Sequence, residues 1–127
     1  MFHELEPAYV LGDFALKAAD KGFIIVPPQE VNVGPWKEQG LALYGSRVTY
    51  ASEFDLSPTP GPYTVSLPEW YGAVAKVAVN GKEAGYIYCK PAECDVTSLL
   101  AAGKNTIEVT VFGTPKNTLG PHHGNPP

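Results

Sequence analysis

The dipeptide Asn80-Gly81 lies between two runs in which apolar and polar residues alternate, and this arrangement constrains the fold more than any other feature of the chain. Both central residues of a type I′ turn need a positive φ, which asparagine and glycine adopt readily. Such a turn joins adjacent antiparallel strands. The sequence therefore predicts a β-hairpin that pairs residues 73–79 with residues 83–89.

The same period of two recurs elsewhere in the chain, and helical periodicity is almost absent. Strands with one apolar and one mostly polar face are expected at residues 47–56, 63–67 and 106–111, and two earlier strands are expected around residues 9–16 and 23–26. Alternation of this kind is typical of antiparallel sheets that pack face to face. About eight strands without a helical layer predict an all-β fold, an antiparallel β-sandwich of the jelly-roll type.

The segments between these strands contain turn and loop residues. Residues 29–44 are expected to form a long loop with at most a short edge strand, because Pro27-Pro28 ends the strand before it. Residues 95–100 are expected to form one short helical turn, capped by Asp95 or Thr97. Gly103 is expected to close that turn, and the last long strand to start at Asn105.

Size and charge restrict the function. The chain has 127 residues, of which 44% are hydrophobic, and this suits one domain over residues 1–127 with loose termini at 1–7 and 120–127. The net charge of −4 and the single arginine, Arg47, argue against binding to nucleic acid. No apolar run approaches the length of a membrane span. The N-terminus lacks the pattern of a signal peptide, so the chain is either cytosolic or part of a longer protein.

The two cysteines, Cys89 and Cys94, are close in sequence. A disulfide between them is geometrically conceivable across a strand end, but two reduced thiols are the preferred interpretation. Their spacing matches no zinc pattern, and a second pair of ligands is missing.

Several short motifs occur in an order that resembles the galactose-binding-like β-sandwich domains of large glycoside hydrolases. The resemblance is greatest to the sugar-binding-type domains of family 2 enzymes and of α-L-rhamnosidase-like enzymes. It covers nearly the whole chain and rests on Leu11-Gly12-Asp13-Phe14, Trp36-Lys37-Glu38-Gln39-Gly40, Tyr44-Gly45, Val79-Asn80-Gly81, Asp95-Val96-Thr97, Gly103-Lys104-Asn105 and Asn117-Thr118-Leu119-Gly120-Pro121-His122-His123. One departure is Cys89, where many relatives carry tryptophan or another large residue.

The resemblance implies a non-catalytic, carbohydrate-binding accessory domain, with carbohydrate and the catalytic domain of a parent enzyme as partners. The alternative is a structural module that braces a catalytic domain and binds no sugar. The parent protein of such a domain would be secreted or periplasmic. No cofactor is expected. Many domains of this kind hold a structural calcium ion, but the sequence marks no ligands for one.

Loop aromatics are the candidate contacts for sugar, because an aromatic face packs against the C–H side of a sugar ring. Trp70 and Tyr71 follow Pro68-Glu69 at a loop end and are the preferred pair. Trp36 and Tyr44 are further candidates, although the resemblance favours a packing role for both. Tyr86 and Tyr88 share one strand face, which is either a surface or a core stripe.

Polar residues in loops are the candidate contacts for sugar hydroxyls. They are Lys90, Glu93, Asn117 and His123. Each of them is alternatively a solvated side chain. For the His122-His123 pair, a further alternative is that one histidine packs on the sandwich and the other is exposed. Adjacent histidines on an extended segment point in opposite directions, so a shared metal ion is not expected.

Catalysis by this chain is not expected. Glycosidases need two carboxylates across a cleft at a defined separation. Glu53 and Asp55 are neighbours on one strand face, and Glu69 lies in a loop, so none of these pairs meets that requirement.

Overall fold

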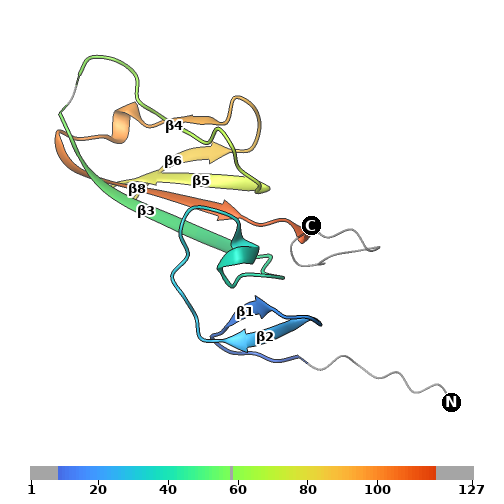
Figure 1. Ribbon diagram of the computed structural model, residues 1–127. Coiled ribbons are helices and arrows are strands. Elements are labelled where there is room, and N and C mark those ends of the chain that lie inside the picture. The colour runs from blue at the N-terminus through green and yellow to red at the C-terminus, as the bar shows by residue number, and fades with distance from the viewer. Residues whose placement is uncertain (1–8, 58, 117–127) are drawn as a thin grey trace.

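The structure, a computed structural model, describes residues 9–57 and 59–116 (Figure 1). This part of the chain contains eight strands and two short 3₁₀ helices. In chain order they are β1 (Ala15–Ala18), β2 (Phe23–Val26), η1 (Trp36–Gln39), β3 (Arg47–Leu56), β4 (Thr64–Ser66), β5 (Val74–Val79), β6 (Lys82–Ile87), β7 (Glu93–Asp95), η2 (Thr97–Leu99) and β8 (Gly103–Phe112).

The strands form three antiparallel sheets. The largest has the order β3-β8-β5-β6, and the two others are the pairs β4-β7 and β1-β2. The β4-β7 pair lies against the four-stranded sheet, whereas the β1-β2 ribbon lies apart from both (Figure 1). The predicted all-β, antiparallel class is confirmed, and the packing of β4-β7 on the large sheet is consistent with a β-sandwich.

The core lies between the large sheet and β4-β7. Val77 and Val79 of β5 are fully buried, and Ile87 of β6 is 1% exposed. Cys94 and Val96 complete the buried cluster from the opposite side. Val77 pairs with Val109 of β8, so the alternation within each strand places the apolar residues of neighbouring strands on one face.

The hairpin predicted at Asn80-Gly81 is confirmed. Asn80 has a φ of 52° and Gly81 a φ of 75°, the two positive values that a type I′ turn requires. The turn joins β5 to β6, which pair from Val79–Lys82 to Ala75–Ile87 with a bulge after Val77.

Three strand predictions need correction. The first strand begins at Ala15 rather than at residue 9, because residues 9–14 have no ladder partner in the structure. The second strand of the hairpin ends at Ile87 rather than at residue 89, close to where its partner β5 begins. Strand β7 was not predicted, because a strand of three residues shows too little alternation to be recognised.

The predicted loop at residues 29–44 and the predicted turn near residue 97 are both observed. The loop holds η1 and one isolated bridge, Leu16 to Leu41. The turn is η2, and the side-chain Oδ1 of Asp95 accepts the N–H of Thr97 at 2.8 Å. The hydrogen bond from the Thr97 side chain, and then that from the Thr97 N–H, lower the pKa of Asp95. Gly103 does not close the turn but begins β8 with a φ of 84°.

The two thiols are free in the structure and have different surroundings. Cys89 is exposed, whereas Cys94 is buried in the core cluster opposite β6. Burial raises the pKa of the Cys94 thiol, and the nearby Asp95 carboxylate raises it further.

The difference predicts selective thiol chemistry. In the native protein, a thiol reagent should modify Cys89 quickly and Cys94 only on unfolding, because the thiolate is the reactive form and needs access to solvent. Mass spectrometry after a brief exposure to iodoacetamide would show one adduct, and a second adduct in denaturant. Two adducts at equal rates in the native protein would contradict the placement of Cys94.

Candidate functional site

The topology gathers the candidate aromatic residues at one end of the large sheet. Strands β3 and β5 begin at this end, and β6 and β8 finish there, as the register between them shows. The segments that carry the candidates adjoin these strand ends: η1 and residues 40–46 lead into β3, residues 67–73 lead into β5, and residues 88–92 follow β6. Residues from three separate parts of the chain therefore occupy one end of the molecule.

Trp36 and Tyr44 are held in a packed arrangement. The indole Nε1 of Trp36 donates to the hydroxyl of Tyr50 at 2.7 Å. The rings of Trp36 and Tyr44 meet edge to face, with their centroids 6.1 Å apart. The Tyr44 hydroxyl donates to the carbonyl of Arg47 at 3.0 Å. The Trp36 and Tyr44 side chains are both half-buried. Their hydrogen bonds and their ring contact fix the loop before β3.

Trp70 and Tyr71 are adjacent but have opposite environments. Trp70 is half-buried and packs against the core cluster. A Cβ added at Gly72 would lie 2.8 Å from the Trp70 ring and 2.7 Å from Val111, so the backbone here approaches both side chains closely. Tyr71 is 96% exposed. Of the preferred pair, Tyr71 presents a free ring to solvent, and Trp70 contributes to packing.

Tyr86 and Tyr88 form a surface stripe, which resolves the two alternatives left open by the sequence. Ile87 between them is buried in the core, and alternation therefore directs both tyrosines to the opposite face. Tyr86 is 48% and Tyr88 69% exposed. The Tyr86 hydroxyl donates to Oε2 of Glu83 at 3.0 Å, and this hydrogen bond raises the pKa of Tyr86.

Tyr88 was not among the predicted contact residues, although its alternation with Ile87 was a usable signal. Tyr88 lies one residue beyond the end of β6, next to the segment that holds Lys90. Tyr71 lies three residues before the start of β5, and β5 and β6 are neighbours with Ala75 opposite Ile87. Two exposed aromatic side chains therefore flank the same end of this strand pair.

The polar candidates divide into those that the structure places and those that it does not. Lys90 and Glu93 are both exposed, and the loop that joins them is tied to β4 by the hydrogen bond from Leu67 N–H to the carbonyl of Ala92, at 2.9 Å. Asn117 and His123 lie outside the described residues. The predicted polar contacts that the structure places near the aromatic end are therefore one ammonium and one carboxylate.

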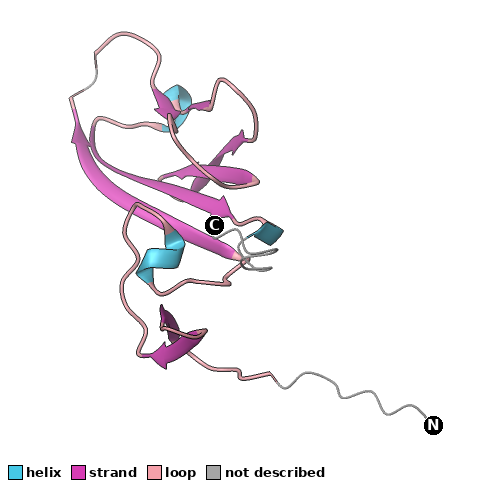
Figure 2. Ribbon diagram, turned by 45° about the vertical axis from the view of Figure 1, so that its right-hand side comes forward, coloured by secondary structure: helices cyan, strands magenta, loops and turns pink. Residues whose placement is uncertain are grey.

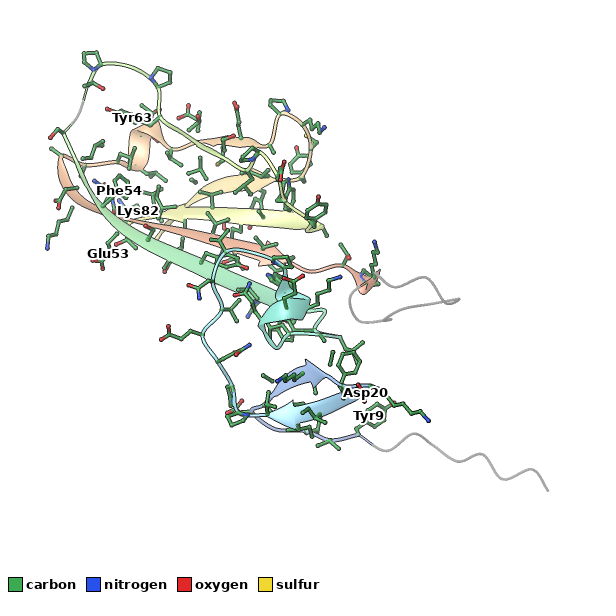
Figure 3. The ribbon with its side chains drawn as sticks, viewed as in Figure 1. Tyr9, Asp20, Glu53, Phe54, Tyr63 and Lys82 are labelled. Carbon is green, nitrogen blue, oxygen red and sulfur yellow. The ribbon has the colours of Figure 1, made fainter. Side chains whose placement is uncertain are left out.

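The acidic residues of β3 lie at the opposite end of the large sheet. Glu53 is exposed on the face turned away from β4-β7, while Phe54 points toward the core side (Figure 3). Asp55 is also exposed, and alternation along the strand places it on the same face as Glu53. With Lys104 and Thr106 they line a hollow of about 320 Å³. Both carboxylates project from one strand, so the hollow lacks the two opposed walls from which glycosidase carboxylates act.

Two further properties concern the described residues alone. Among residues 9–57 and 59–116, no group of three or more histidine, cysteine, aspartate or glutamate side chains is arranged to hold a metal ion. Within the same ranges, no helix has the length and apolar character needed to cross a membrane.

Comparison with known proteins gives a similarity in structure. No family model matches the chain, and no curated protein matches it. Among solved structures, the rhamnosidase from Novosphingobium sp. PP1Y is similar, with a TM-score of 0.57 and 20% sequence identity. The match covers 99% of this chain and 13% of the rhamnosidase chain. At this identity the likeness establishes a shared β-sheet fold, and this chain spans only a small part of the length of the rhamnosidase.

Proposed function

We propose that the chain is a non-catalytic accessory domain of a glycoside hydrolase-like protein and that it contacts carbohydrate through its aromatic end. The observation that carries the proposal is the exposure of Tyr71 and Tyr88 at one end of the β5-β6 pair. Support for the glycoside hydrolase context comes from the similarity to a small part of a rhamnosidase. The motifs that resemble sugar-binding-type domains point to the same class.

In the proposed mode of binding, a tyrosine ring stacks on the C–H face of a sugar. Aromatic rings supply apolar contact area, and nearby polar groups orient the hydroxyls. Lys90 and Glu93 are exposed in the adjoining segment and provide a donor and an acceptor. The surface around Tyr71 is not enclosed by other side chains, so little area is buried and the affinity is expected to be weak.

The test is a binding screen of the intact chain against polysaccharides and oligosaccharides, with Tyr71→Ala and Tyr88→Ala beside it. Loss of binding of about tenfold or more is expected in at least one variant, which corresponds to the removal of one stacking contact worth about 1.4 kcal/mol. Val33→Ala is a suitable control, because it removes an exposed apolar side chain from a different part of the molecule. Equal binding by all variants, or no binding to any glycan by the folded chain, would refute the proposal.

A second candidate is a structural module that braces a catalytic domain. It is favoured by a second hollow on the core face of the large sheet, where β3 and β8 are neighbours and other side chains do not fully cover the sheet. Tyr50, Ile107 and Val109 line this hollow of about 320 Å³, with Val31 and Val33 from the loop on its other side. An apolar surface of this kind often marks an interface. A chain that binds no glycan would favour this candidate.

A further inference from the structure

The β1-β2 ribbon is the least covered element of the described chain. It lies apart from the two packed sheets in both ribbon views (Figures 1 and 2). Three successive apolar residues of β2 are exposed: Phe23 by 40%, Ile24 by 51% and Ile25 by 56%. Since neighbouring side chains of a strand point to opposite faces, both faces of β2 are apolar and exposed. A strand with this composition is typical of a sheet that is covered on both sides.

The ribbon is fixed at its inner edge, so it cannot turn back onto the sandwich without losing contacts. The N–H of Leu16 donates to the carbonyl of Gly40 at 2.8 Å, and Leu16 bridges to Leu41. Ala15 is 4% exposed, and a Cβ at Gly40 would lie 2.6 Å from that of Ala15. Strand β1 therefore has a neighbour on each side, and the outer edge of the ribbon belongs to β2.

The hydrogen bond of Leu16 also shows which backbone N–H and C=O groups of β2 point toward this outer edge. The Leu16 N–H points away from β2, so Leu16 and Ile25 form a pair without mutual hydrogen bonds in the ladder. The N–H and C=O of Ile25 then point away from β1. Two residues earlier, the same groups of Phe23 point the same way. Among the described residues, β2 pairs with β1 alone, and no backbone hydrogen bond reaches these outward groups of Phe23 and Ile25.

No residue within β2 protects its outer edge against pairing with another strand. Charged side chains and prolines commonly provide such protection. The four residues of β2 include neither. Charged residues occur within the other strands with a free edge except β4: Arg47, Glu53 and Asp55 in β3, Lys82 and Glu83 in β6, and Glu93 and Asp95 in β7. Strands β2 and β4 have only flanking prolines, Pro27-Pro28 after β2 and Pro62 and Pro68 around β4, which limit the length of a ladder but leave the edge of the strand itself open.

We propose that two copies of the chain associate through β2, which pairs antiparallel with β2 of the second copy about a two-fold axis. In this register Phe23 of one copy lies opposite Ile25 of the other, and Ile24 faces its own equivalent. The outward N–H and C=O groups of Phe23 and Ile25 then form the ladder. The result is a four-stranded sheet, which is more stable than an isolated two-stranded ribbon.

The geometry favours a second copy over an unrelated partner, because the edge is self-complementary. A two-fold axis presents the same patch on both sides of the interface. Between Gly22 and Val26, the proposed register brings no charged residue opposite another. Tyr9, Val10 and Leu11 are also exposed, and Tyr9 lies beside the ribbon near Asp20 (Figure 3). They add apolar area on the same part of the molecule.

Light scattering coupled to gel filtration, over a dilution series, tests the association. The expected species has twice the monomer mass of 13.6 kDa and dissociates on dilution. Ile24→Lys should give a monomer, because it places two like charges face to face at the axis. Ile25→Pro should also give a monomer, since it removes an outward N–H and leaves the bonds to β1 intact. Circular dichroism checks that both variants are folded.

Val33→Lys is the matched control, because Val33 is 90% exposed and lies outside the ribbon. It should leave the dimer unchanged. Hydrogen exchange gives an independent readout: protection of the Phe23 and Ile25 amides should rise with protein concentration. A wild-type monomer at every concentration would overturn the proposal, as would a dimer that survives both ribbon variants. Neither outcome bears on glycan binding, which is measured separately.

Discussion

Asn105→Ala is expected to lower the free energy of unfolding by about 2–4 kcal/mol, a large loss for a single polar side chain. Asn105 is 2% exposed, and its amide group is fully used. Its Oδ1 accepts from the N–H of Ala101 and from Nδ2 of Asn80, each at 2.9 Å. Its Nδ2 donates to the carbonyls of Ala101 and Gly103, at 2.7 and 2.8 Å. Truncation removes all four of these hydrogen bonds, which are partly buried.

The loss should be large because the network connects two distant turns. Asn80 of the β5-β6 hairpin also donates to the carbonyl of Leu99 at 3.1 Å and accepts from the N–H of Thr106 at 2.9 Å. Asn105 therefore holds the end of η2, the start of β8 and the hairpin in one arrangement. Buried polar groups in a connected network are costly to leave partly satisfied.

Urea denaturation of Asn105→Ala against the parent measures the effect, and Asn32→Ala is the matched control, because Asn32 is exposed. The control should change stability by less than about 0.5 kcal/mol. Asn105→Asp should be at least as destabilising as Asn105→Ala at neutral pH, because a carboxylate oxygen would face two carbonyls. A loss at Asn105 no greater than that at Asn32 would contradict the network.

The sequence predicted the strands well where alternation was long and failed where an element depends on its neighbours. Residues 47–56 and the final strand, which pair with each other in the structure, were each recognisable as a strand from their own pattern, whereas their pairing was not predicted. Strand β7 was missed because three residues carry too little periodicity, and its position is set by pairing with β4. The role of Asn105 was also missed, because Gly103-Lys104-Asn105 identifies a turn but not the partners of its amide.

Only part of the candidate site could be predicted, because the exposure of each aromatic side chain depends on how the strands pack around it. The sequence selected loop aromatics, and the topology does bring them to one end of the sheet. It could not separate Trp70, which packs on the core, from Tyr71, which is 96% exposed. Both follow the same proline-containing segment, and only the position of the opposite strands decides which ring is covered.

Val77→Asp is expected to unfold the domain at room temperature. Val77 is fully buried at the centre of the core, between Gly85 of β6 and Val109 of β8. A carboxylate there would have no counter-ion, and an unpaired buried charge costs several kcal/mol. The total stability of a small domain is roughly 5–15 kcal/mol, and a domain with a core of this size lies near the lower limit.

Two variants separate the effect of charge from other effects. Val33→Asp makes the same chemical change at a side chain that is 90% exposed, and it should melt within a few degrees of the parent. Val77→Ala removes the same apolar atoms without adding charge, and it should lose about 2 kcal/mol yet remain folded. Circular dichroism of the three variants, with thermal melts, gives the comparison. If Val77→Asp melted like Val33→Asp, β5 would not be the central strand of the core, and the register between β5, β6 and β8 would have to be rejected.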